Sequence, residues 1–95
     1  MYKFKRGIPV DYDTQGYIYF ISRRYASLTD SARKRIDNMC NVAGGEYGKA
    51  LFAFVTTNAG YEECCRRHYI SQAQLYRIVR RYYILFNEEI VCGLW

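Results

Sequence analysis

Proline and histidine are almost absent from this chain, which contains one of each among its 95 residues. The single proline and the dense apolar periodicity argue against intrinsic disorder, because disordered segments are rich in proline and poor in apolar residues. Long apolar runs are also missing, so no stretch is long enough to span a bilayer. A chain of this length has room for one hydrophobic core, and we expect a single domain over residues 1–95.

The beginning of the sequence, MYKFKRGIPV, carries positive charge without the apolar core of a secretory signal peptide. We therefore expect a cytoplasmic protein whose four cysteines are reduced thiols. The cysteines lack the paired C-x2-C spacing of structural zinc sites, so we expect small core residues and no metal. The less favoured alternative is a metal site. Its ligands would come from Cys40, Cys64, Cys65, His68 and Cys92.

The single histidine, His68, limits the catalytic chemistry that this chain can support. Cys64 precedes it by four residues and shares its helical face, which is compatible with a Cys–His pair. No glycine-rich element that would stabilise an oxyanion and no third member accompany the pair. The sequence therefore predicts a protein that is not an enzyme, with no catalytic residues and no cofactor.

The formal net charge is +5, and the positive charge is clustered. Between Arg66 and Tyr83 there are five arginines and no acidic residue. Guanidinium groups pair well with phosphates and with guanine, so this run favours a polyanion partner over a merely solvated surface. The acidic residues lie elsewhere. They include Asp11, Asp13, Glu62, Glu63, Glu88 and Glu89.

Apolar periodicity predicts an all-α fold, a compact bundle of about five helices with short connections. We expect helices near residues 16–26, 30–43, 46–57, 61–69 and 72–86. The segment 17–22 also has the composition of a strand, and we predict a helix there because no partner strand is visible nearby. The inner face of this first helix would consist of Tyr17, Ile18, Ile21 and Tyr25.

Both ends of the chain lie outside these predicted helices. Residues 1–14 are expected to form an extended basic arm, because Gly7 and Pro9 oppose early helix formation. Its basic residues are Lys3, Lys5 and Arg6. We favour a strap across the surface over insertion into a DNA minor groove. Residues 87–95 are too apolar for a free tail, and we expect them to dock on the domain or on a partner. The docking residues would be Ile90, Val91, Leu94 and Trp95.

Residues 61–86 organise the chain as two helices joined by a tight turn. Ser71 and Gln74 have the S-x-x-Q spacing of a capping box, which would start the second helix. Apolar residues recur behind this cap at helical spacing and predict one buried face. They are Leu75, Ile78, Val79, Tyr82 and Phe86. The inner side of the shorter first helix would consist of Cys64, Cys65 and His68.

This pattern resembles the helix-turn-helix of DNA-binding proteins. That family has a small residue inside its first helix, where Cys65 stands, and an apolar residue before the cap, where Ile70 stands. The chain differs at two positions, with Tyr69 where the family often has glycine and His68 where it has an aliphatic residue. The resemblance implies a C-terminal helix-turn-helix over residues 61–86.

The resemblance further implies that the second helix lies in the major groove of duplex DNA. Its first turn and outer face would then contact the bases. The contact residues would be Ser71, Gln72, Ala73, Tyr76, Arg77 and Arg80. Gln72 suits an adenine edge and Arg77 a guanine edge. The residues better placed for phosphates would be Arg66, Arg67 and Arg81.

We therefore favour a small duplex-DNA-binding protein, such as a transcription regulator or accessory factor of a phage or mobile element. The alternative is an inhibitor or adaptor that binds another protein, since helix-turn-helix cores are reused for that purpose. Small basic phage proteins of this size include anti-CRISPR proteins, some of which have helix-turn-helix folds. Such a protein would use exposed tyrosines, the arm or the tail. A homodimer stays open in either case, and no membrane partner is expected.

Overall fold

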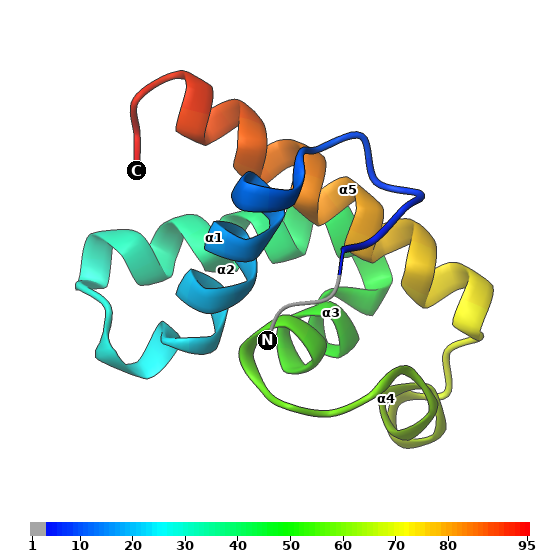
Figure 1. The fold of residues 1–95 in the computed structure, drawn as a ribbon. Coiled ribbons are helices and arrows are strands. Elements are labelled where there is room, and N and C mark those ends of the chain that lie inside the picture. Colours follow the sequence, from blue (N-terminus) through cyan, green and yellow to red (C-terminus); the bar gives the residue numbers. More distant parts are fainter. Residues whose placement is uncertain (1–3) are drawn as a thin grey trace.

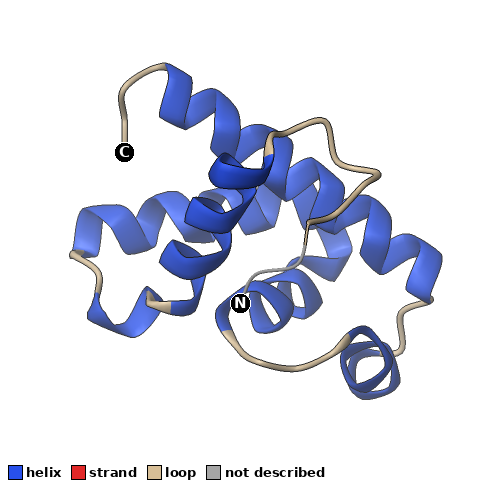
Figure 2. Cartoon of the chain, viewed as in Figure 1, coloured by secondary structure: helices blue, strands red, loops and turns tan. Residues whose placement is uncertain are grey.

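The computed structural model describes residues 4–95, and the regular structure in this range is helical (Figures 1 and 2). The α-helices are α1 (Tyr12–Arg23), α2 (Asp30–Gly44), α3 (Gly48–Thr56), α4 (Tyr61–His68) and α5 (Gln72–Val91). Two short 3-10 helices cover Tyr25–Ser27 and Gly45–Tyr47. No strand occurs within residues 4–95, so the all-α class is confirmed and residues 17–22 are helical.

Side-chain caps explain where α1 and α2 begin. The Asp11 carboxylate accepts a hydrogen bond from the backbone N–H of Thr14 at 2.7 Å, so α1 begins at Tyr12. This start lies four residues before the predicted one, so the described segment before α1 covers residues 4–11. The Thr29 hydroxyl caps α2 in the same way, at 3.2 Å from the backbone nitrogen of Ala32.

The buried face of α1 differs from the predicted one. Ile18 is fully buried as expected, but Tyr17 is 43% exposed. Gln15 and Ser22 are buried instead, each with a polar partner. The Ser22 hydroxyl lies 2.6 Å from the Tyr82 hydroxyl of α5. The apolar periodicity does not predict that these two residues are buried, because buried polar residues depend on partners that are distant in the sequence.

Gln15 also fixes the segment before α1 on the domain. Its side-chain nitrogen donates to the carbonyls of Lys5 at 3.1 Å and Val10 at 2.9 Å, and its oxygen accepts from the Lys5 backbone N–H at 2.9 Å. Ile8 and Val10 are buried beside it. Residues 4–11 therefore lie against the helices. Lys3 and the rest of residues 1–3, which belong to the predicted basic arm, lie outside the described residues.

The long helix α5 crosses the molecule from α4 to the C-terminus and supplies much of the core (Figure 1). Its predicted inner face is confirmed. The five residues Leu75, Ile78, Val79, Tyr82 and Phe86 are all buried. Against them pack residues of the other helices, including Ile18, Ile36 and Leu51. None of the helices within residues 4–95 is both long enough and apolar enough to cross a membrane.

The C-terminal end of α5 continues to Val91, beyond the predicted end at residue 86. Trp95 folds back from the tail and stacks on Phe86, with ring centroids 4.5 Å apart. Its indole nitrogen donates to the Glu89 carboxylate at 2.9 Å. This contact places part of the tail on the domain, whereas Val91 and Leu94 stay exposed.

Candidate nucleic-acid interface

The connection between α4 and α5 turns at Tyr69, whose backbone is left-handed with φ 55° and ψ 45°. Among the described residues it is the single non-glycine residue with a positive φ. The backbone N–H of Ile70 donates to the Cys65 carbonyl at 3.2 Å, which closes the turn at the end of α4. Ile70 is buried and Tyr69 is 92% exposed. A left-handed residue thus stands where the helix-turn-helix family often has glycine.

The start of α5 has the predicted capping box. The Ser71 hydroxyl accepts from the backbone N–H of Gln74 at 3.1 Å, and the Gln74 side-chain oxygen accepts from the Ser71 N–H at 3.3 Å. The Gln74 side-chain nitrogen also donates to the Tyr47 hydroxyl at 3.4 Å. These contacts fix the first turn of α5 while Ser71 and Gln72 stay exposed.

The fully buried cysteine of α4 is Cys64, whereas Cys65, the small residue predicted to lie inside this helix, is only partly buried. Cys64 is buried, and its thiol donates to the Ala50 carbonyl of α3 at 3.4 Å. Cys65 is only partly buried at the edge of the core. Helix α4 packs on α3 as well as on α5, and the more deeply buried cysteine is the one that contacts α3.

The residues of the alternative metal site do not come together. Within residues 4–95, no group of three or more His, Cys, Asp or Glu side chains is placed to hold a metal ion. Burial raises the pKa of the Cys64 thiol, and burial together with the Asp37 carboxylate raises that of Cys40 to about 12. Both thiols are therefore protonated near neutral pH, which disfavours them as metal ligands or nucleophiles.

All of the predicted DNA contacts are solvent-exposed. The set comprises Ser71, Gln72, Ala73, Tyr76, Arg77, Arg80, Arg66, Arg67 and Arg81. Arg67 lies 3.9 Å from the Glu63 carboxylate, in an exposed pair of little energetic weight. In the part of the chain that the structure describes, Arg66, Arg77 and Arg81 have no ion-pair partner. These three guanidinium groups are thus available to an anion.

Two of the predicted contacts face the segment before α1. The Arg80 side-chain Nε donates to the Gly7 carbonyl at 3.0 Å. A Cβ atom built on Gly7 would lie 1.7 Å from the Tyr76 hydroxyl, so Tyr76 packs directly on this glycine. No local signal predicts this contact, because a glycine in a basic segment does not indicate which distant side chain lies over it.

Arg81 lies apart from the first turn of α5. It lines a hollow of about 290 Å³ between α2 and α5, together with Val42, Ala43, Ile84 and Leu85. The predicted DNA contacts therefore lie in three separate parts of the structure. Gln72, Arg77 and Arg66 lie on or near the exposed start of α5, Tyr76 and Arg80 contact Gly7, and Arg81 borders an apolar surface.

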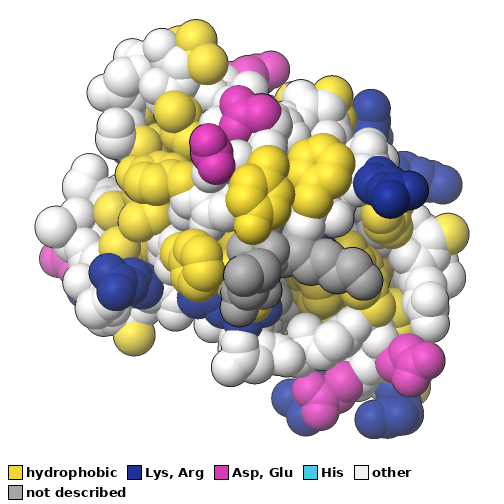
Figure 3. All heavy atoms as spheres, viewed as in Figure 1, with side chains coloured by type: hydrophobic (Ala, Val, Ile, Leu, Met, Phe, Trp, Pro, Cys, Tyr) yellow, Lys and Arg dark blue, Asp and Glu magenta, His cyan; other side chains and the backbone are white. Residues whose placement is uncertain are grey.

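An exposed aromatic surface on α1 was not predicted. Tyr12, Tyr17 and Phe20 are all exposed, and Phe20 has an exposed fraction of 53%. Figure 3 shows hydrophobic side chains gathered over α1 on the face viewed there. The sequence predicts Tyr17 in the core, because the helical period alone does not show that Gln15 is buried and Tyr17 exposed.

Comparisons with protein-family models, with curated proteins and with solved structures find no match for this chain. What the candidate interface binds must therefore be inferred from its own residues. Its chemistry is that of an exposed, capped helix start beside arginines without acidic partners. Backbone N–H groups at such a helix start and guanidinium groups both bind phosphate oxygens.

Proposed function

We propose that this protein binds duplex DNA through α4, the turn at Tyr69 and the first turns of α5. The observation that carries the proposal is the arrangement at the start of α5. Ser71 caps the helix, Gln72 is exposed on its first turn, and Arg77 lies on its outer face without an ion-pair partner. A helix presented in this way by a preceding short helix fits the major groove.

The proposed contacts divide into base and phosphate contacts. Gln72 would bind an adenine edge and Arg77 a guanine edge, because these side chains match the hydrogen-bonding groups of those bases. Arg66 on α4 would bind the DNA backbone, along with the first N–H groups of α5. Arg67 would exchange its weak pair with Glu63 for a phosphate. These residues would set both the register and the sequence preference.

In this proposal Tyr76 and Arg80 contact both Gly7 and the DNA. The hydrogen bond to the Gly7 carbonyl uses only Nε of Arg80, and the other guanidinium N–H groups would be free to bind a phosphate. Residues 4–11 would thus orient Arg80 beside the DNA. No enzymatic step and no cofactor is part of the proposed function.

The test is fluorescence anisotropy of a labelled random duplex titrated with the full chain over a series of salt concentrations. The proposal predicts binding that weakens linearly on a log–log plot as salt increases, because phosphate contacts release counterions. Arg24→Ala is a matched control, since Arg24 is exposed at the C-terminal end of α1 and is not one of the proposed contacts. Binding with no salt dependence, or no binding at low salt, would contradict the proposal.

A second candidate function is the binding of another protein, and the exposed aromatic surface of α1 favours it. Aromatic side chains are enriched at protein interfaces because they bury a large area at low cost in conformational entropy. Phe20→Ala should leave duplex binding unchanged under the DNA proposal. An inhibitor or adaptor that acts through α1 would instead lose its partner with Phe20→Ala and keep it with Arg77→Ala.

A further inference from the structure

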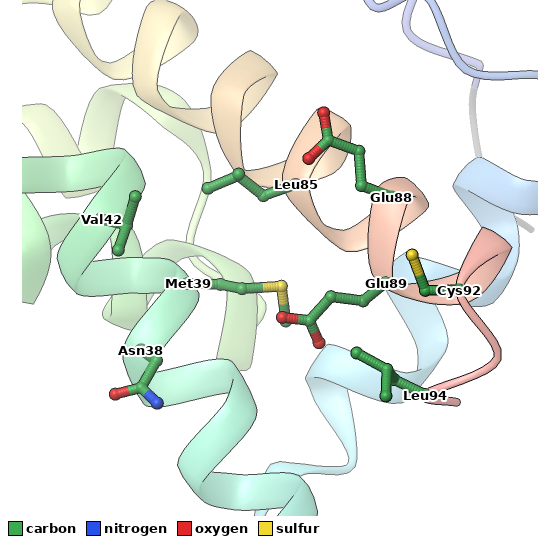
Figure 4. A pocket seen from close by; sticks show the side chains of 8 residues that line it. All are labelled: Asn38, Met39, Val42, Leu85, Glu88, Glu89, Cys92 and Leu94. Carbon is green, nitrogen blue, oxygen red and sulfur yellow. The ribbon is translucent and has the colours of Figure 1, made fainter.

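A continuous apolar groove lies between α2 and the last turns of α5. It consists of two adjoining hollows of about 280 and 290 Å³, which share Val42 and Leu85. Val42 is 69% exposed and Leu94 is 46% exposed, so apolar side chains of the groove face solvent. In Figure 4, Leu85 of α5 points toward Val42 of α2, and Met39 lies below them. An apolar surface of this kind is typical of an interaction site.

Opposite charges stand at the two sides of this surface along α5. Arg81 lines one hollow and Glu88 lines the other, about two helical turns away on the same face. Neither side chain has an ion-pair partner among residues 4–95, whereas the neighbouring Glu89 lies 3.7 Å from Arg35. In Figure 4 the Glu88 carboxylate stands at the rim and points away from Met39.

The order of these side chains along α5 is self-complementary. Reading from Arg81 to Glu88, a positive group is followed by the apolar pair Ile84 and Leu85 and then by a negative group. Reversing the helix direction exchanges the charges and leaves the apolar centre in place. This is the property that a two-fold interface requires, because the same surface must complement itself.

We propose that the α2–α5 groove binds a second copy of this chain, with the two α5 helices antiparallel and centred on Ile84 and Leu85. Arg81 of each copy then pairs with Glu88 of the other, and Ile84 of each copy lies against Leu85 of the other. The exposed Val42 side chains add apolar contact from α2. Complementary charges on both sides of the centre fix the register, as charged positions do in paired helices.

This interface goes beyond the proposed DNA binding and does not depend on it. Gln72 and Arg66 lie outside the groove, so both stay exposed in the dimer. In the dimer Arg81 pairs with Glu88 of the other copy, whereas the sequence predicts that it contacts a phosphate. The dimer therefore has its own test, in which no DNA is present.

The test is sedimentation velocity of the full chain over a range of protein concentrations at low salt. The parent protein should change from monomer to dimer as concentration increases. Arg81→Glu and Glu88→Arg should each weaken dimerisation by about tenfold or more, since each puts two like-charge pairs across the interface. Arg24→Glu makes the same charge change at the end of α1 and should have no effect.

The decisive sample is an equimolar mixture of the two weakened variants. In that mixture a heterodimer has complementary pairs at both sites, so dimerisation should return close to the parent level. Circular dichroism of each variant confirms that the helices are intact. A parent chain that stays monomeric at every concentration would overturn the proposal. A mixture that dimerises no better than the single variants would overturn it as well.

Discussion

The first and last turns of α5 differ in the side chains that they expose. The first turns expose Gln72 and Arg77 beside α4, with no acidic residue between Arg66 and Tyr83. The last turns carry Glu88 beside an apolar groove. One continuous buried face runs beneath both halves, from Leu75 to Phe86. The shared buried face joins the two halves in one fold, whereas their outer surfaces differ: one exposes basic and polar side chains, and the other borders an apolar groove.

The largest effect is expected from a change in the shared buried face. Leu75→Ala should destabilise the fold by about 2–5 kcal/mol, because a fully buried leucine is removed and a cavity is left. Urea denaturation followed by circular dichroism measures the change. Arg77→Ala on the exposed face of the same helix is the control and should stay within about 0.5 kcal/mol. Equal stability of the two variants would show that the face is wrongly assigned.

A smaller effect separates the two neighbouring cysteines of α4. Cys64→Leu should cost about 1–3 kcal/mol of stability, because the larger side chain has no room beside the Ala50 carbonyl. Cys65→Leu should cost less, since Cys65 is only partly buried. Melting temperatures of the pair decide between the two residues. A greater loss with Cys65→Leu would restore the assignment suggested by the sequence.

These cases show which features of the fold can be predicted from the sequence. The cap at Ser71 and the helical period behind it predicted the start and the buried face of α5, because both signals are local, but not its end at Val91. The start of α1 was missed because its capping residue, Asp11, was assigned to the extended arm. The choice between Cys64 and Cys65 depends on α3, and the contact between Arg80 and Gly7 joins residues far apart in the chain. Such contacts have no local signal.

Among the arginines, Arg66 offers a test of the phosphate contacts near the start of α5. Arg66→Ala should weaken binding to all duplex sequences about equally and reduce the log–log salt slope by about one. Anisotropy titrations with several duplexes over a salt series measure both quantities. If the affinity falls for one sequence only, Arg66 contacts a base and the division into base and phosphate contacts is wrong.

The smallest expected effect concerns the turn that joins α4 to α5. Tyr69→Gly should stabilise the protein by up to about 1 kcal/mol, because glycine adopts a left-handed backbone without a steric penalty. Tyr17→Gly is the matched control, since it replaces an exposed tyrosine inside a regular helix and should destabilise α1. Thermal denaturation compares the two. Destabilisation by Tyr69→Gly would mean that the tyrosine side chain supports the turn.

A paired measurement on Arg77→Ala is the sharpest test of the proposal that the first turns of α5 bind DNA. Duplex affinity and melting temperature are measured together for the parent, for Arg77→Ala and for Arg24→Ala. We expect Arg77→Ala to lose roughly 1–3 kcal/mol of binding free energy at an unchanged melting temperature, while Arg24→Ala matches the parent. Binding of Arg77→Ala that equals that of the parent would contradict the claim.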